Sequence, residues 1–136
     1  MECVFCNIVT RKSEAEIVFE NENVLSFLDI RPINFGHTLV IPKQHNENFL
    51  SVPPAELSQL TTTTQIIAEA VIKSLHADGF NIIVNQGVAA GQTIFHFHFH
   101  IIPRFNNDFK FKPTFKIYED DGRKSFADKI RSELNK

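Results

Sequence analysis

Apolar and polar residues alternate in short runs through most of this chain and follow a helical spacing in one long segment. The short runs are rich in β-branched and aromatic residues and are bounded by Asn, Pro or Gly, which is typical of strands separated by turns. Five such runs are predicted strands: residues 17–20, 24–29, 37–41, 80–84 and 95–102. The third of them stops at Pro42, which has no backbone donor.

A long helix is predicted to begin at Pro53 and Pro54 and to end at Asp78-Gly79. Its apolar positions recur at three- and four-residue steps and therefore share one face: Leu57, Leu60, Thr64, Ile67, Val71 and Leu75. Near the C-terminus, residues 125–134 repeat this spacing and predict a short second helix. Strands on both sides of a long helix predict an α+β domain, with an antiparallel sheet of about five strands covered by helices.

Length and composition predict a single domain over residues 1–136, because the chain is too short for two full cores. The net charge of −2 gives no global positive field that would attract nucleic acid. No apolar run approaches the roughly 20 residues that cross a bilayer, and the N-terminus has no basic or apolar leader. We therefore expect a cytoplasmic protein that binds neither nucleic acid nor membranes.

Histidines give the first indication of chemistry. Residues 95–101 read Phe-His-Phe-His-Phe-His-Ile, so a strand there would carry His96, His98 and His100 on one face and apolar residues on the other. Imidazole can be a nucleophile, an acid–base group or a metal ligand near neutral pH. A solvated strand face is the simpler alternative. A purely metal-binding row is a second one, although three histidines in line rarely supply a compact tetrahedral shell.

A loop of small residues precedes the histidines and favours phosphate chemistry. Residues 87–93 combine two glycines with the amide of Gln92 and the hydroxyl of Thr93. Such a segment can direct backbone N–H groups and a hydroxyl at phosphate oxygens. Most glycine-containing loops merely turn the chain. Directly ahead of three histidines, however, this loop indicates phosphoryl or nucleotidyl transfer.

Three blocks of sequence together resemble the histidine triad (HIT) superfamily. Residues 91–102 are similar to its His-x-His-x-His signature, and residues 27–32 and 36–45 match its upstream blocks in order and spacing. The resemblance covers about residues 3–104 and leaves the tail 105–136 weakly constrained. It implies a HIT-like fold and a homodimer that binds purine nucleotides and cleaves them at the α-phosphate.

The resemblance also implies roles for individual residues. The middle histidine, His98, would attack phosphorus and form a covalent nucleotidyl-histidine, while His100 and the loop donors stabilise the charge on phosphate, and His37 supports the triad. The residues expected to bind the nucleotide are Asp29, Asn85, Gly91, Gln92, Thr93, Phe5, Ile8, Phe27 and Ile30. Two simpler interpretations stay open: Asp29 as a residue that caps a turn, and the apolar residues as ordinary core.

Cys3 and Cys6 form a Cys-x-x-Cys pair, which is half of a common zinc pattern. Buried free thiols and a redox pair are the alternatives. In the histidine triad proteins that carry this pair, the shell is completed by the histidine of a Pro-Lys-x-His run and by the first triad histidine. The resemblance therefore implies structural zinc held by Cys3, Cys6, His45 and His96, and no organic cofactor.

These expectations combine into a purine nucleotide hydrolase or transferase, with a dinucleoside polyphosphate such as diadenosine tetraphosphate as the favoured substrate. A nucleoside phosphoramidate is the alternative substrate. A nucleotide-binding adaptor with incidental hydrolysis is the alternative class of protein. Alternating Phe and Lys at residues 109–112 favour an edge strand, with a contribution of residues 104–118 to the dimer or to the substrate rim as a further option.

Overall fold

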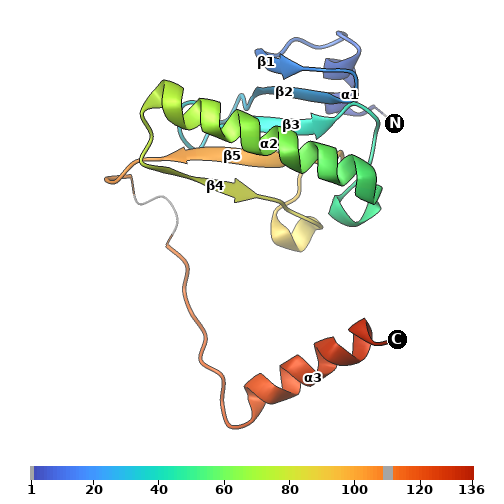
Figure 1. Ribbon diagram of the computed structural model, residues 1–136, viewed down its shortest axis with the longest axis vertical. Helices are drawn as coiled ribbons and strands as arrows, with labels where there is room; N and C mark the ends of the chain where they lie inside the picture. Colours follow the sequence, from blue (N-terminus) through green and yellow to red (C-terminus); the bar gives the residue numbers. More distant parts are fainter. Residues whose placement is uncertain (1, 109–111) are drawn as a thin grey trace.

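The computed structural model describes residues 2–108 and 112–136. A short helix opens the chain, a long helix interrupts the strands and a third helix closes it (Figure 1). The helices are α1 (Val4–Val9), α2 (Pro54–Leu75) and α3 (Gly122–Leu134). The strands are β1 (Ile17–Glu20), β2 (Val24–Leu28), β3 (Thr38–Pro42), β4 (Gly79–Ile83) and β5 (Phe99–Arg104), and 3-10 turns lie at Phe49–Ser51 and Val88–Ala90.

The strands of the described residues form one five-stranded antiparallel sheet in the order β1-β2-β3-β5-β4. This arrangement confirms the predicted α+β class. The crossover through α2 brings β5 between β3 and β4, so the strand that carries His100 and directly follows His96 and His98 lies inside the sheet rather than at its edge. Within these residues, no helix combines the length and the apolar character needed to cross a membrane.

The two faces of the sheet carry separate apolar clusters. Period-two alternation sends Val24 and Val40 to the face covered by α2 (Figure 1), where they pack with buried residues such as Leu60 and Phe97. The intervening residues point to the opposite face and pack with Phe5 of α1 and its neighbours. The members of this second cluster are Phe5, Ile8, Leu25, Phe27, Leu39 and Ile41. The site described below is built on this second face.

Helix α2 begins where the prolines predict and ends earlier than predicted. Its last residue is Leu75, because His76 adopts a left-handed conformation with φ 55° and thereby stops the helix before Asp78-Gly79. The threonine run at 61–64 is accommodated because three of its hydroxyls, including that of Thr64, donate to carbonyls one turn earlier. The apolar stripe is therefore sufficient to hold a helix that local propensity disfavours.

Strand β5 begins four residues later than the sequence predicts. Its ladder with β3 starts at the pair Val40–Phe99, and residues 95–98 lie outside the sheet. The prediction fails there because the facing end of β3 is Pro42, which cannot donate to a ladder. Instead, Phe97 donates its N–H to the carbonyl of Asn46 at 2.6 Å, outside the sheet ladder.

The turn before β3 requires a glycine at position 36. Gly36 has φ 95°, and a Cβ built on it would lie 2.3 Å from Cδ1 of Leu75 at the end of α2. The left-handed backbone favours glycine, and a larger residue would also have to displace the tip of the Leu75 side chain. The turn thus lies directly against the end of α2, next to the segment that carries His37.

The C-terminal arm, residues 112–136, departs from the rest of the molecule. Figure 1 shows an extended segment that leads to α3, which lies apart from the sheet and from α2. The predicted helix 125–134 is present and begins three residues earlier, at Gly122. Residues 112–118 form no strand, and most of the edge strand predicted at 109–112 lies outside the described residues.

The position of the core predicts that the same Leu→Ala substitution lowers the free energy of unfolding very differently at two sites. Leu60 on α2 is fully buried, whereas Leu50 is 78% exposed. We expect Leu60→Ala to lower the free energy of unfolding by about 2–5 kcal/mol, because it leaves a cavity against the sheet. Leu50→Ala should change it by less than about 0.5 kcal/mol. Urea unfolding of both variants checks this, and equal losses would contradict the assigned core.

Candidate active site and metal centre

The first turn of α1 brings the two cysteines to one side of the helix. Cys3 is its N-cap and its Sγ accepts the N–H of Cys6 at 3.4 Å. His45, just after β3, and His96, just before β5, complete a group whose ligand atoms all lie within 4.8 Å of one another. The structure therefore brings together the four residues that the resemblance implies for a metal.

The spacing of these four atoms suits a tetrahedral zinc ion. The Sγ–Nδ1 distances are 3.4 Å for Cys3–His96, 3.5 Å for Cys6–His45 and 3.5 Å for Cys6–His96, and the two Nδ1 atoms lie 3.2 Å apart. Tetrahedral Zn–S and Zn–N bonds of about 2.3 and 2.1 Å give S–N and N–N separations of roughly 3.6 and 3.4 Å. The donor set and its geometry thus fit structural zinc with no open position.

Protonation at this centre also suits a metal. Nε2 of His96 lies 2.7 Å from the carbonyl of Pro42, so it carries the proton and leaves the Nδ1 lone pair facing the sulfurs. Burial lowers the pKa of His96 to about 4 and keeps it neutral. Burial, together with the Cys3 sulfur, raises the pKa of the Cys6 thiol to about 11, so this thiol needs a nearby cation to ionise.

The ring of His98 is oriented by a hydrogen bond from Nδ1, which leaves Nε2 unprotonated. Its Nδ1 donates to the carbonyl of His96 at 2.8 Å, which fixes the proton on Nδ1 and leaves a lone pair on Nε2. The ring is buried and packs edge-on against Phe5, with centroids 5.2 Å apart. Burial lowers the pKa of His98 below its usual value, although the carbonyl partner and Asp29 oppose this. A neutral imidazole with an unprotonated Nε2 is the form a nucleophile requires.

A hydrogen bond joins the rings of His37 and His100, and the backbone N–H of Ile33 determines which ring donates. The N–H of Ile33 donates to Nδ1 of His37 at 3.1 Å, so neutral His37 carries its proton on Nε2. That proton is donated to Nδ1 of His100 at 2.9 Å, which assigns the proton of His100 to its outer nitrogen, Nε2. Burial lowers the pKa of His100 to about 4. His100 is thus a neutral donor beside His98, at 4.7 Å between ring centroids.

Asp29, His37 and His100 form a second group whose possible ligand atoms lie close together. Their hydrogen bonds, however, favour a hydrogen-bonded chain over a metal site. A metal would need the lone pair of Nε2 on His37. The N–H of Ile33 already occupies the other nitrogen, so Nε2 is a donor. Asp29 accepts the N–H of Arg31 through Oδ1, and its Oδ2 lies 3.6 Å from Nε2 of His37. Asp29 therefore caps a turn and still offers one carboxylate oxygen.

These groups line a cavity of about 570 Å³ on the α1 side of the sheet. Of the residues that the sequence assigns to the site, those lining it are Phe5, Ile8, Phe27, Asp29, Ile30, His37, Thr93, His98 and His100. Phe5, Ile8 and Phe27 also belong to the buried cluster, so a core role and a pocket role coincide in them. Ile30 is 90% exposed and lies at the rim. The volume is in the range of small-ligand sites.

The loop before the histidines contributes less directly than the sequence suggests. Gln92 is buried: its Oε1 accepts the N–H of Gly87, and its Nε2 donates to the carbonyls of Glu47 and Ile94. Gly91, at φ 93°, donates its own N–H to Val88.

These bonds hold the loop itself, so Thr93 is the loop residue that lines the cavity. Asn85 lies beside Gly91, with its Nδ2 4.0 Å from a Cβ built there, and does not line the cavity.

Sequence reasoning did not assign nine of the residues that line the cavity, and Arg31 and Ile33 are two of them. The backbone N–H of Ile33 sets the tautomers of His37 and His100, and the side chain of Arg31 lines the cavity. Pro32 and Gly36 mark the loop as a turn, which indicates unusual backbone geometry there. No residue type signals which side chain a backbone N–H will meet, so Ile33 could not be found from the sequence.

Comparison with known proteins agrees with this geometry. The family model "HIT domain" matches residues 10–107. The chain belongs to the HIT family. It is 34% identical to a HIT family protein from Bacillus subtilis whose crystal structure aligns with a TM-score of 0.87 over 97% of this chain and 96% of that one. A zinc-bound histidine triad family protein from Mycobacterium smegmatis is 42% identical, with a TM-score of 0.78 over 100% and 99% of the two chains.

A curated relative adds a named activity. The adenylylsulfatase HINT3 of Arabidopsis thaliana is 40% identical over 107 residues, which are 79% of this chain and 54% of the plant protein. HIT family proteins are in general nucleotide hydrolases or transferases. The histidines, the apolar cavity and the carboxylate of Asp29 are thus set in a fold of nucleotide-binding proteins.

The depressed pKa of His100 predicts a specific pH dependence of stability. In the unfolded chain this histidine takes up a proton near pH 6.5, whereas the folded site resists it down to about pH 4. The contribution of neutral His100 to the free energy of unfolding is therefore complete above pH 6.5 and is lost as the pH falls toward 4.

We expect the stability advantage of the wild type over His100→Gln to shrink on this descent by on the order of 2 kcal/mol, a value reduced for partial exposure. Urea unfolding of both proteins at pH 7.5 and 4.5 measures it. An advantage that does not change with pH would contradict the assignment.

Proposed function

We propose that the protein hydrolyses purine nucleotides at the α-phosphate, with His98 as the nucleophile. The observation that carries this proposal is the bond from Nδ1 of His98 to the carbonyl of His96. It leaves the lone pair of Nε2 to a ring that lines the same cavity as Asp29, Thr93 and His100. Nucleophile, hydroxyl donor, imidazole donor and carboxylate are thus gathered around one volume.

In the first step, the Nε2 lone pair of His98 forms a bond to the α-phosphorus while the bond from phosphorus to the leaving oxygen breaks. The ring becomes a nucleotidyl-imidazolium, whose charge is stabilised because Nδ1–H already donates to the carbonyl of His96. In the second step, water attacks phosphorus and gives up a proton to solvent while the N–P bond breaks, which releases nucleoside monophosphate and returns neutral His98 with its proton on Nδ1. The outer N–H of His100 and the hydroxyl of Thr93 would donate to the phosphate oxygens.

The cavity suits the rest of a nucleotide. Phe5, Ile8, Phe27 and Ile30 offer apolar walls for a purine base, and the free oxygen of Asp29 offers an acceptor for ribose hydroxyls. We favour a dinucleoside polyphosphate such as diadenosine tetraphosphate, since its polyphosphate leaving group departs as an anion without a proton. A nucleoside phosphoramidate is the second candidate, and the plant relative's name adds adenylyl sulfate to the substrates worth testing.

The proposal includes a homodimer and a cytoplasmic location, both of which follow from the family resemblance. Neither nucleic acid nor a membrane is a proposed partner. A nucleotide-binding adaptor without significant turnover is the rival class, and the same cavity would serve it. The intact nucleophile and its ordered tautomer favour catalysis over binding alone.

The nucleophile can be tested with paired variants. We expect wild-type protein to turn over diadenosine tetraphosphate, adenosine phosphoramidate or adenylyl sulfate and to form an acid-labile nucleotidyl adduct detectable by mass spectrometry. His98→Ala should lose both, with a fall in kcat of roughly 10³-fold or more. His76→Ala, which changes an exposed histidine at the end of α2, is the matched control and should keep full activity. Turnover that survives in His98→Ala would overturn the mechanism.

We further propose that Cys3, Cys6, His45 and His96 hold one structural zinc ion per chain. It would tie α1 to the segment before β5, and it supplies no chemistry to the substrate because all four positions are filled by protein. The zinc-bound relative from Mycobacterium smegmatis supports this metal. The redox alternative loses support, because each sulfur lies beside an imidazole nitrogen.

Metal content and stability test this second proposal together. Elemental analysis of the purified protein should find about one zinc per chain. Cys6→Ser should remove most of it and lower the thermal unfolding temperature, because folding then loses the free energy of metal binding. The His76→Ala protein is again the control, with unchanged zinc. A metal-free wild type that unfolds at the same temperature with and without added zinc would rule the centre out.

A further inference from the structure

Arg31 lines the site cavity and has no role in the function proposed above. It shares this cavity of about 570 Å³ with Asp29, His98 and His100. Among the described residues that line the cavity, Arg31 alone is a Lys or Arg, so it brings the one permanent positive charge. Its backbone N–H donates to Asp29 at 2.8 Å, and no described residue forms a hydrogen bond or ion pair with its guanidinium.

The other polar groups of the cavity add no positive charge at neutral pH. Burial lowers the pKa of His37 and lowers the pKa of His100 to about 4, so both rings donate hydrogen bonds as neutral groups. Asp29 and Glu14 line the same cavity with carboxyl groups. A polyphosphate brings several negative charges into this surrounding, and a cation is needed to offset them. Arg31 is the lining residue that can supply it.

Hydrogen bonds connect the backbone of Arg31 to the histidine that would donate to phosphate. The N–H of Arg31 donates to Oδ1 of Asp29, and Oδ2 of Asp29 lies 3.6 Å from Nε2 of His37. His37 in turn donates to Nδ1 of His100 at 2.9 Å. The stem of Arg31 thus begins close to the proposed phosphate site, and its length is sufficient to bring the guanidinium to a charged group bound there.

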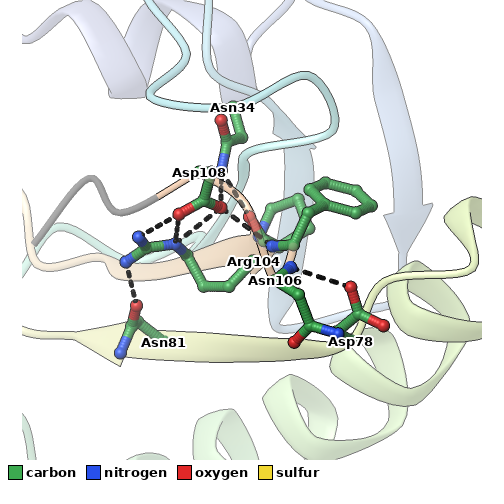
Figure 2. A network of polar contacts seen from close by, with 8 residues as sticks. Asn34, Asp78, Asn81, Arg104, Asn106 and Asp108 are labelled. Atoms are coloured by element: carbon green, nitrogen blue, oxygen red, sulfur yellow. Dashed lines mark hydrogen bonds and ion pairs between the residues drawn. The ribbon is translucent and has the colours of Figure 1, made fainter.

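The rest of the turn between Asp29 and His37 is anchored to the end of β5. Asn34 donates to the carbonyl of Pro103 at 2.8 Å and to Asp108 at 3.0 Å. Figure 2 shows Asn34 directed at Asp108, which is also paired with Arg104. These bonds fix the backbone from which the exposed side chain at position 31 extends. A binding group on a fixed backbone loses less freedom when a ligand binds.

In-line displacement determines on which side of phosphorus the leaving group lies. The attacking nitrogen and the leaving oxygen lie on opposite sides of phosphorus. His98 is only 9% exposed, so the leaving group would lie on the opposite, open side of the cavity. The exposed lining residues Ile30 and Arg31 belong to this rim. The leaving group and the guanidinium would therefore meet at the mouth of the cavity.

We propose that Arg31 binds an anionic leaving group and thereby makes polyphosphate and sulfate leaving groups preferred over neutral amines. This inference rests on the proposed function and specifies its leaving group. When the bond from the α-phosphorus to the bridging oxygen breaks, the electron pair stays on that oxygen, and the planar guanidinium stabilises the leaving anion through hydrogen bonds to two of its oxygens. A phosphoramidate leaves as a neutral amine after its nitrogen takes a proton from solvent, so it gains nothing from this cation.

Two variants that remove the same charge test the proposal by a comparison of substrates. Arg31→Gln removes the cation from the cavity, whereas Arg123→Gln removes one from the exposed surface of α3. Arg31→Gln should lower kcat/KM roughly ten- to fiftyfold for diadenosine tetraphosphate and adenylyl sulfate, and less than about threefold for adenosine phosphoramidate. Arg31→Lys should restore part of the loss, because it returns the charge without the planar fork. Arg123→Gln should leave all three values unchanged.

Binding to inactive protein separates this inference from hydrolysis itself. In the His98→Ala background, Arg31→Gln should raise the dissociation constant of diadenosine tetraphosphate roughly tenfold and leave that of adenosine phosphoramidate nearly unchanged. A wild type without turnover would refute hydrolysis, and this comparison would still test Arg31. Equal losses for the two ligands, or equal losses of kcat/KM for charged and neutral leaving groups, would overturn the role of Arg31 and leave the His98 mechanism intact.

Discussion

Backbone groups that fix the protons of four histidines are the constraint on which the site depends. The carbonyl of Pro42 holds the proton of His96 on Nε2, and the carbonyl of His96 in turn holds that of His98 on Nδ1. The N–H of Ile33 does the converse for His37 and, through it, for His100. Because three of these rings are buried, His100 is half-buried and all four are neutral, one backbone bond decides which nitrogen of each ring carries the proton and which keeps a lone pair.

The late start of β5 follows from the same bonds. In a regular ladder, His96 would stand in register with β3 and its backbone would be used in pairing. The proline at position 42 ends that ladder, and the freed carbonyls of Pro42 and His96 accept side-chain N–H groups instead. The alternation predicted from sequence nevertheless persists: Phe97 and Phe99 pack under α2, while the histidines face α1. Periodicity therefore predicted the faces correctly and the strand boundary wrongly.

The sequence allowed a prediction of which side chains lie near one another, but not of the hydrogen bonds that they form. The strands and α2 follow from periodicity, which is a local property, whereas the group of Cys3, Cys6, His45 and His96 was implied by the family resemblance. The bonds that satisfy Gln92 depend on the carbonyl of Glu47, 45 residues away, and no local pattern encodes that contact. The apolar face of α3 could also be predicted from the sequence. The position of α3 outside the domain, in contrast, depends on the long-range hydrogen bonds of Arg104 and Asn106.

His96 connects the proposed zinc centre to His98, the proposed nucleophile. Its ring faces the cysteines, and its carbonyl lies 2.8 Å from the nitrogen that orients His98. A zinc ion with four protein ligands offers no position to substrate, so it can affect turnover only by holding this carbonyl in place. Loss of the ion would then let the backbone at residue 96 move. The proton of His98 would no longer be fixed on Nδ1, and its ring would no longer be held in one orientation. Under the two proposals above, one peptide group links the metal to catalysis, and a change in either should reach the other through hydrogen-bond geometry rather than through charge on the substrate.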